Sequence, residues 1–219
     1  PGVMCESPPL PLKYEPMDMV RDNITSLRYC LYNLSVCLLQ LKVAVYYEAL
    51  CPDSKSFVTQ QLYPAWQNLH DAIRVKLVPY GKAINKEGKW EFDCQHGPRE
   101  CYGNKIQGCA LKSKDLTDGQ KFDLIRCLMA DRNPDMALQQ CAGVVNVAAS
   151  AIESCANGTK GDEILASYGD KTHQLNPNLA FVPTVIFNEK FNQADQDAAM
   201  SDLKGVICRL STKKPKACP

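Results

Sequence analysis

The stretch Lys42-Val43-Ala44-Val45-Tyr46-Tyr47-Glu48-Ala49-Leu50-Cys51-Pro52-Asp53-Ser54 decides the fold that we expect for this chain. Its first six residues are β-branched and aromatic enough to predict a buried strand. Its last four have the C-x-x-C layout of a redox site, with Ser54 where the second thiol belongs. Cys51 could therefore attack a disulfide as a nucleophile, but Ser54 could not resolve the product.

A helix is predicted to follow over about residues 52–72. Apolar residues spaced three or four apart form one stripe that would pack on a sheet: Phe57, Val58, Leu62, Ala65, Trp66, Leu69 and Ile73. Pro64 should kink or interrupt this helix. The helix N-terminus favours a thiolate at Cys51, a charge on Asp53 opposes it, and Ser54 could donate a hydrogen bond to the sulfur. The alternative is that Cys51 is a buried structural cysteine beside a helix cap.

Length and charge limit the classes of protein that the chain can belong to. The 219 residues are 45% hydrophobic, which suffices for one core or for one domain with an insertion. The 25 basic and 24 acidic residues give a net charge of +1, which argues against nucleic acid or an anionic membrane as the main partner. No run of apolar residues is long enough to predict a transmembrane segment. The first residue is proline, which fits a mature chain after removal of a signal peptide and equally an artefact of expression.

Twelve cysteines indicate an oxidising compartment, because a reduced cytosolic chain needs far fewer. Three N-x-S/T sequons agree and predict glycosylation at Asn23, Asn33 and Asn157. We therefore expect a secreted or lumenal glycoprotein with most of its cysteines in disulfides. If Cys51 is free, eleven cysteines remain, so at least one more must be free or paired between chains.

The domain organisation follows from the order of the predicted elements. Residues 1–39 are expected to be an N-terminal extension that is partly irregular, and residues 40–219 a single domain. The first strand, its helix and a second strand at residues 75–79 form a β-α-β unit, which is parallel in nearly all cases. Residues 184–187 and about 194–210 predict a last strand and a last helix.

A helical insertion is expected between about residues 94 and 178, where no convincing strand occurs. Cys127 and Cys141 flank a turn within it and could bridge a helical hairpin. Trp90-Glu91-Phe92, just before the insertion, is a short strand candidate. The periodic helical segments of the insertion are 116–129, 136–141, 144–155 and 161–168.

This order of elements predicts an α/β, thioredoxin-like fold with a long disulfide-linked helical insertion. In that fold a cis proline lies against the active cysteine, just before the strand that corresponds to residues 184–187 here. Pro183 is the proline placed for that role and is expected to face Cys51.

A second motif begins at Cys94 and resembles the signature of a known family. The run Cys94-Gln95-His96-Gly97-Pro98-Arg99-Glu100-Cys101-Tyr102-Gly103-Asn104, with Cys109 five residues on, matches C-Q-H-G-x-x-E-C-x-x-N-x-x-x-x-C without a gap. This run is similar to the signature of the gamma-interferon-inducible lysosomal thiol reductase (GILT) family. The resemblance extends over about residues 41–218 and includes Tyr46-Tyr47-Glu48-Ala49-Leu50-Cys51, Leu77-Val78-Pro79-Tyr80-Gly81, Trp90-Glu91-Phe92 and Val182-Pro183.

The resemblance implies a lysosomal or secreted glycoprotein related to enzymes that reduce protein disulfides at acidic pH. It carries the nucleophile to Cys51 and the cis proline to Pro183. The best-known members have C-x-x-C, so Ser54 departs from them and resembles the site of invertebrate members. The resolving role is therefore vacant, and release of the enzyme from a mixed disulfide would depend on an outside thiol or on another cysteine of the substrate.

The signature could also be interpreted as a zinc site built from Cys94, His96, Cys101 and Cys109. That spacing is unusual for structural zinc, and an oxidising compartment favours disulfides, so no metal is expected. His96 is then expected to be a hydrogen-bonding residue of a disulfide-knotted loop. No cofactor is expected, although a small thiol could act as co-reductant.

Two functions remain open on the sequence alone. The first is a weak thiol oxidoreductase that acts on disulfide-containing proteins through Cys51 with impaired turnover. The second is a redox-inactive secreted glycoprotein that uses the reductase scaffold to bind another protein or a cell surface. Ser54 favours the second function, whereas retention of Cys51 in its strand-helix setting favours the first.

Overall fold

A three-stranded sheet forms the centre of the part of the chain that the structure describes. The computed structural model describes residues 40–85, 91–131 and 133–219, so the predicted extension at 1–39 lies outside it. Strand β1 (Leu41–Tyr47) pairs in parallel with β2 (Ile73–Pro79) and antiparallel with β5 (Thr184–Phe187), which gives the order β2-β1-β5. Because β1 is the middle strand, most of its side chains are buried on both faces of the sheet.

A second sheet has two strands, which follow β2 along the chain. It pairs β3 (Ile84–Asn85) with β4 (Phe92–Asp93) in antiparallel. The predicted strand at 90–92 is therefore displaced towards the C-terminus, with Phe92 inside β4, while Trp90 lies outside the described residues.

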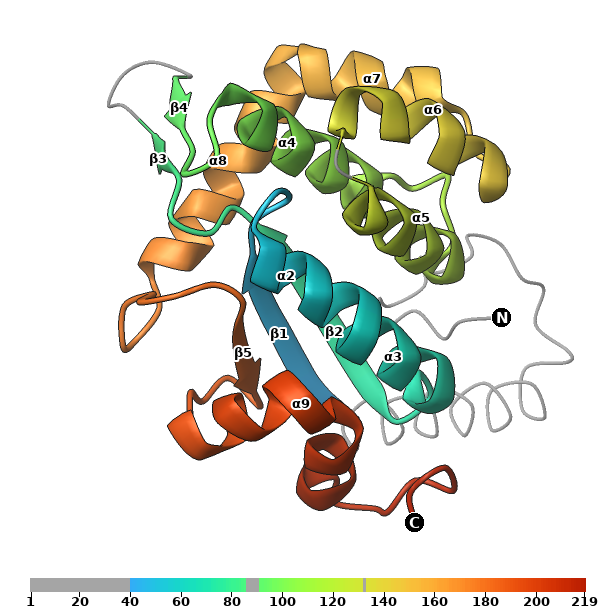
Figure 1. The fold of residues 1–219 in the computed structure, drawn as a ribbon, viewed down its shortest axis with the longest axis vertical. Helices are drawn as coiled ribbons and strands as arrows, with labels where there is room; N and C mark the ends of the chain where they lie inside the picture. Colours follow the sequence, from blue (N-terminus) through green and yellow to red (C-terminus); the bar gives the residue numbers. More distant parts are fainter. Residues whose placement is uncertain (1–39, 86–90, 132) are drawn as a thin grey trace, which may run out of the picture. The chain divides into compact units, whose positions relative to one another are not determined.

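The helix predicted over 52–72 is present but is not a regular α-helix throughout (Figure 1). It consists of α2 (Pro52–Phe57), a π-helical turn η1 (Val58–Leu62) and α3 (Tyr63–Leu69). Pro64 is the second residue of α3 and has no N–H to give to the carbonyl four residues earlier. The wider π turn just before it accommodates this missing bond, so the predicted interruption takes the form of a change of helix type.

Five helices fill the interval between β4 and β5. They are α4 (Pro98–Lys112), α5 (Asp118–Ala130), α6 (Pro134–Val144), α7 (Ala149–Asn157) and α8 (Thr159–His173). The last four match the periodic segments of the sequence, with ends shifted by a few residues. Helix α5 begins with a capping box, in which Thr117 and Gln120 bond reciprocally to each other's backbone N–H groups.

Helix α4 was not predicted, because its sequence has no apolar stripe. The other four helices of the insertion all pack against it, and α4 and α8 also contact β2 (Figure 1). Nine of its fifteen residues are buried, polar ones included, so burial on nearly every side replaces the usual one-face pattern. Gly108 permits close approach of α8, since a Cβ there would lie 2.8 Å from Ile164 Cγ2.

Four disulfides hold the described residues. Cys94–Cys101 closes the start of α4, Cys109–Cys155 joins α4 to α7, and Cys127–Cys141 joins α5 to α6. The predicted bridge of a helical hairpin by Cys127 and Cys141 is thus confirmed.

The chain closes with β5 and α9 (Gln193–Leu210), and α9 packs against β5 and η1. The fourth disulfide, Cys208–Cys218, fastens the C-terminal tail to the end of α9. No helix among the described residues is both long enough and apolar enough to cross a bilayer.

Candidate functional site

Cys51 is the N-cap residue of α2, immediately after the loop that follows β1. Its carbonyl accepts the Lys55 N–H at 3.0 Å, which starts the helix. It is the one free cysteine among the described residues, and 7% of the residue is exposed. The other three of the twelve cysteines, Cys5, Cys30 and Cys37, lie outside the described residues. The structure therefore places an unpaired thiol at a helix start, close to the surface.

Pro183 lies on the segment that faces this thiol, although 131 residues separate Val182 from Cys51 in the chain. The Val182–Pro183 peptide bond is cis, and Cys51 Sγ lies 3.9 Å from the Val182 carbonyl oxygen. Gln196 of α9 fixes this segment from behind, because its amide donates to the Pro183 carbonyl at 3.1 Å and accepts the Val185 N–H at 2.7 Å. Gln196 is 2% exposed, and no sequence pattern indicated its role.

Ser54 lies on the buried side of α2, one turn after Cys51, and is fully buried. Its hydroxyl oxygen accepts the Glu48 N–H at 3.4 Å. Among the described residues no hydrogen bond joins it to Cys51, so the expected donation to the sulfur is not observed. The serine instead ties α2 back to the loop before Cys51.

One face of α4 holds that loop in place with three buried polar side chains. Glu100 Oε2 accepts the Leu50 N–H at 3.3 Å, and Asn104 Oδ1 accepts the Ala49 N–H at 2.9 Å. One turn further on, Gln107 accepts the hydroxyl hydrogen of Tyr47 at 2.6 Å, and burial raises the pKa of that tyrosine well above its ordinary value. Glu100 and Asn104 belong to the signature, which therefore positions the backbone that leads into Cys51.

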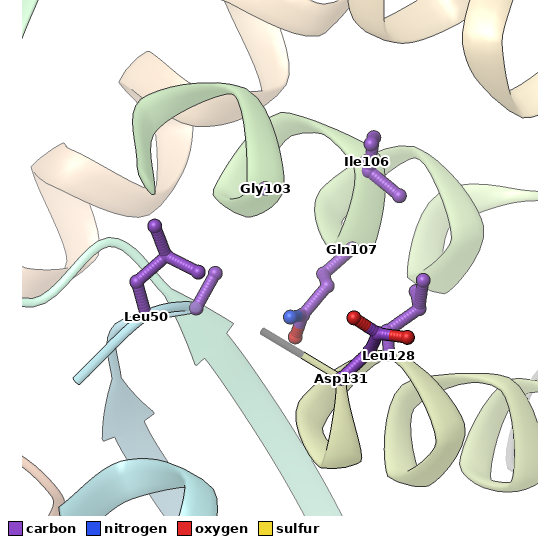
Figure 2. A pocket seen from close by; sticks show the side chains of 7 residues that line it. Leu50, Gly103, Ile106, Gln107, Leu128 and Asp131 are labelled. Carbon is purple, nitrogen blue, oxygen red and sulfur yellow. The ribbon is translucent and has the colours of Figure 1, made fainter. Parts of the chain in front are cut away.

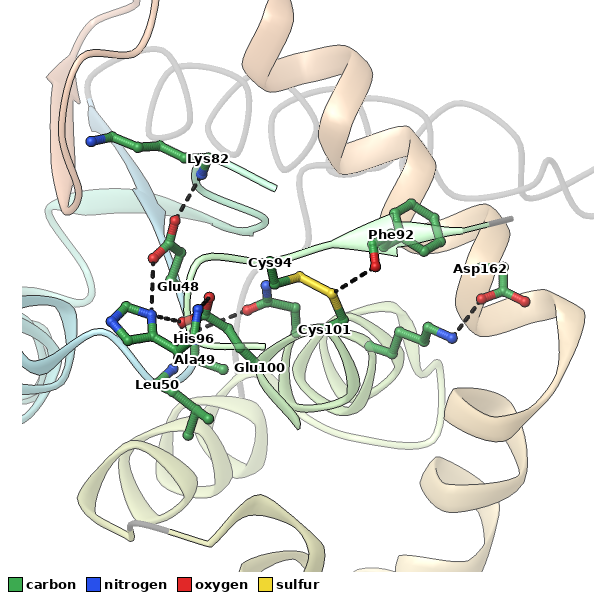
Figure 3. The surroundings of a disulfide bond; sticks show 12 residues. Glu48, Ala49, Leu50, Lys82, Phe92, Cys94, His96, Glu100, Cys101 and Asp162 are labelled. Atoms are coloured by element: carbon green, nitrogen blue, oxygen red, sulfur yellow. Dashed lines mark hydrogen bonds and ion pairs between the residues drawn. A yellow bond between two sulfur atoms is a disulfide. The ribbon is translucent and has the colours of Figure 1, made fainter. Parts of the chain in front are cut away.

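The start of the signature forms a disulfide-closed loop around His96 (Figure 3). Its cysteines are in disulfides, Cys94 with Cys101 and Cys109 with Cys155. These sulfur atoms therefore cannot be zinc ligands, which excludes the cysteine-based zinc site that the sequence offered as an alternative. Gly97 has φ +79° and ψ −172° at the N-cap of α4, a conformation that only glycine adopts readily. His96 Nδ1 lies 2.6 Å from Glu100 Oε2, as expected for a hydrogen-bonding residue of such a loop. Gln95, by contrast, is exposed.

One small hollow adjoins the loop before Cys51, and a larger cleft lies elsewhere among the described residues. Figure 2 shows the smaller one, whose volume of about 10 Å³ has room for about one water. It is lined by Ala49, Leu50, Gly103, Ile106, Gln107, Leu128 and Asp131. A larger cleft of about 400 Å³ lies between the turn Gly81–Ile84, the end of α8, and Asn178 and Leu179.

Of the three sequons, only the one at Asn157 lies within the described residues. Asn157 is exposed at the last position of α7, and Thr159 begins α8. Asn23 and Asn33 lie outside the described residues.

Comparison with known proteins identifies relatives over most of the chain. The family model for gamma interferon inducible lysosomal thiol reductase (GILT) matches residues 42–145. GILT-like protein 1 of Drosophila melanogaster is 36% identical over 206 residues, which cover 86% of this chain and 82% of that protein. The gamma-interferon-inducible lysosomal thiol reductase of Carassius auratus is 34% identical over 80% of this chain and 71% of its own length.

Solved structures resemble the fold at low sequence identity. Oxidised BdbD from Bacillus subtilis matches with a TM-score of 0.53 and 13% identity, over 76% of this chain and 87% of that one. DsbA from Chlamydia trachomatis matches with a TM-score of 0.52 and 11% identity, over 75% of this chain and 86% of that one. The predicted thioredoxin-like fold with its disulfide-linked helical insertion is confirmed.

Proposed function

Because the chain belongs to the gamma interferon inducible lysosomal thiol reductase family, we propose that it is a secreted or lysosomal thiol oxidoreductase that acts on protein disulfides through Cys51 and turns over slowly. One observation carries this proposal. The free Cys51 thiol lies at the start of α2, 3.9 Å from the carbonyl of Val182 and beside the cis Pro183. The buried disulfides and the exposed sequon at Asn157 support an oxidising compartment.

The reaction begins with attack of the Cys51 thiolate on one sulfur of a substrate disulfide. A bond forms between Cys51 and that sulfur, the substrate S–S bond breaks, and the other sulfur leaves as a thiolate that takes up a proton. Position 54 offers a hydroxyl, which cannot attack the mixed disulfide. A thiolate from outside the enzyme's site must therefore attack it. Where that thiolate comes from a small thiol, two small thiols are oxidised to their disulfide for each substrate disulfide that is reduced.

Where the attacking thiolate is another cysteine of the same substrate, the outcome is disulfide isomerisation without net oxidation or reduction. The burial of Cys51, of which 7% is exposed, and the missing second thiol both favour slow release. The mixed disulfide should therefore accumulate whenever small thiols are scarce.

A redox-inactive binding protein on the same scaffold is the second candidate function. It is favoured by Ser54, whose fully buried hydroxyl bonds to the Glu48 N–H and so has a structural use of its own. In that case the partner is a protein or a cell surface, and the thiol at Cys51 is dispensable for binding.

Exchange with insulin disulfides in the presence of reduced glutathione tests the first function. The unsubstituted protein should form a mixed disulfide through Cys51 that mass spectrometry detects after acid quenching, and Cys51→Ala should form none. The matched control removes Cys208 and Cys218 together, which deletes a remote disulfide and should leave the exchange unchanged. Equal exchange by Cys51→Ala and the unsubstituted protein would show that Cys51 is not the nucleophile.

A further inference from the structure

Three side chains from two separate segments converge beside the loop that leads to Cys51. Glu48 follows β1, whereas His96 and Glu100 belong to the signature loop and α4. Figure 3 shows Nδ1 of the His96 imidazole facing both carboxylates. His96 Nδ1 lies 2.6 Å from Glu100 Oε2 and 3.6 Å from Glu48 Oε2, and the three potential ligand atoms all lie within 4.8 Å of one another.

The hydrogen bonds of this cluster leave one buried acceptor without a donor. Glu48 Oε1 accepts the Lys82 N–H at 2.8 Å, and Glu100 Oε1 accepts the His96 N–H at 3.0 Å. Glu48 Oε2 has no hydrogen-bond partner, although the glutamate side chain is only 1% exposed. A buried carboxylate oxygen in that state costs free energy, because it has left water without a replacement donor.

Charge is also unbalanced within the cluster. Two ionised carboxylates carry two negative charges, and His96 can supply at most one positive charge. The Lys82 backbone N–H faces Glu48, and the Lys82 ammonium attracts that carboxylate, but the side chain extends away from the carboxylates (Figure 3), so its charge is the smallest influence on the pKa of Glu48. A divalent cation would match the two carboxylates while His96 remained neutral.

From this geometry we propose that Glu48, His96 and Glu100 form a binding site for a divalent transition-metal ion of the zinc type. One imidazole nitrogen and two carboxylate oxygens are a donor set that zinc accepts. Bonds of about 2.1 Å at tetrahedral angles place ligand atoms about 3.4 Å apart. The distances of His96 Nδ1 from Glu100 Oε2 and from Glu48 Oε2, 2.6 Å and 3.6 Å, lie on either side of this value, so His96 and Glu100 must separate by less than about 1 Å to admit the ion. The ion takes the place of a proton between His96 Nδ1 and Glu100 Oε2; the neutral ring then carries its one proton on Nε2, and any further proton held by the cluster is released to solvent.

The surroundings already hold the ligands in the orientation that the ion needs. The Lys82 and His96 N–H groups fix the outer oxygen of each carboxylate, as second-shell donors do in metal sites. Gly81, with φ +60°, lets the backbone pass directly over Glu48, since a Cβ there would lie 2.1 Å from Glu48 Cγ. The His96 side chain is 39% exposed, which opens one side of the cluster to an entering ion and to a water ligand.

This site differs from the zinc site considered on the sequence. That alternative required the thiolates of Cys94, Cys101 and Cys109, which are in disulfides. The proposed site uses oxygen and nitrogen ligands, which an oxidising compartment does not remove. It is independent of exchange at Cys51 and would join the loop before α2 to the signature.

Zinc binding to the tag-free protein tests the proposal directly. The Cys51→Ser background removes the one free thiol of the described residues, and Zn²⁺ is titrated against a chromophoric chelator in excess Mg²⁺. We expect one Zn²⁺ per chain, an X-ray absorption spectrum with nitrogen and oxygen but no sulfur in the first shell, and a higher Tm with Zn²⁺. His96→Ala, at a partly exposed position, and Glu48→Gln should each weaken the affinity at least about tenfold.

His70→Ala is the matched control, because His70 is an exposed histidine of a different segment that contacts Asp71. It should bind Zn²⁺ as the Cys51→Ser parent does. If Glu48→Gln does not fold, as judged by circular dichroism, the comparison of His96→Ala with His70→Ala decides the question. The proposal is overturned if the parent takes up no stoichiometric Zn²⁺, or if His96→Ala binds Zn²⁺ as tightly as His70→Ala.

Discussion

Replacing Ser54 by cysteine should restore the release step that this site lacks. Residues 51 and 54 lie one helical turn apart, so their Cβ atoms are expected about 5–6 Å from each other. Residue 54 is fully buried, so a thiol at this position of α2 would be kept away from bulk solvent. The Ser54→Cys variant exchanges one oxygen for one sulfur and adds no other atom.

The size of the effect follows from comparing an internal thiol with an external one. Flexibly linked groups reach effective concentrations of about 1 mM, and rigidly aligned ones reach about 10⁵ M or more. A thiol held within one helical turn falls between these limits, and we take about 1 M. Against about 1 mM glutathione, release should then be faster by about a thousandfold, or about 4 kcal/mol in activation free energy. The weaker Glu48 N–H bond to sulfur should cost up to about 1 kcal/mol of stability.

Single-turnover release of a fluorescent peptide from a preformed Cys51 mixed disulfide measures this gain. In the unsubstituted protein the rate should rise in proportion to the glutathione concentration and extrapolate to zero without it. In Ser54→Cys the rate should have a large intercept that does not depend on glutathione. Ser54→Ala is the matched control and should behave as the unsubstituted protein does. A folded Ser54→Cys variant without an intercept would refute the idea that position 54 is aligned for resolution.

Three further predictions concern the supports of the site. Removal of the disulfide between Cys109 and Cys155, which are 46 residues apart, should lower the free energy of unfolding by about 4 kcal/mol. Removal of the disulfide between Cys208 and Cys218, which are 10 residues apart, should lower it by about 2.7 kcal/mol. Urea denaturation checks this order, and equal losses would contradict it. Asn104→Leu leaves the buried Ala49 N–H unpaired, so it should lower the free energy of unfolding by about 1–3 kcal/mol and slow exchange at Cys51. Gln95→Ala, at an exposed signature position, should change neither quantity. Similar behaviour of the two variants would mean that the signature does not position the loop. Burial, followed by the charge of Glu100, raises the pKa of Glu48. This group therefore favours folding most below the ordinary carboxyl pKa of about 4.3 and loses that contribution as the pH rises through the raised pKa. With a chelator present, the urea midpoint should fall more between about pH 4 and pH 7 in the unsubstituted protein than in Glu48→Gln, and parallel curves would rule this out.

The sequence predicted the elements whose evidence is local. The strand at 42–47, the helix after Cys51 and the strand at 184–187 carry dense β-branched or periodic apolar residues, and all three are present. Helix α4 was missed because it is buried on nearly every side, and its buried Glu100, Asn104 and Gln107 look like surface residues in a one-dimensional pattern.

The candidate site was predictable only as far as motifs reach. Cys51 and Pro183 were placed by their order in a known topology, and the structure brings their segments together. Glu48 contacts His96 from a different segment of the chain, and Gln196 reaches the Pro183 carbonyl 13 residues away; neither contact follows a spacing rule. Such contacts arise from tertiary packing, so no local pattern announces them.

The place of β5 in the sheet has a consequence for biosynthesis. Strand β5 is the antiparallel neighbour of β1 and follows the segment that faces Cys51, so the site cannot assemble before residue 187 has emerged from the ribosome. The three disulfides between Cys94 and Cys155 join residues that are made earlier. They can close while the chain is still being synthesised. Once their six thiols are consumed, fewer wrong partners remain for Cys51 during the interval in which it is unprotected.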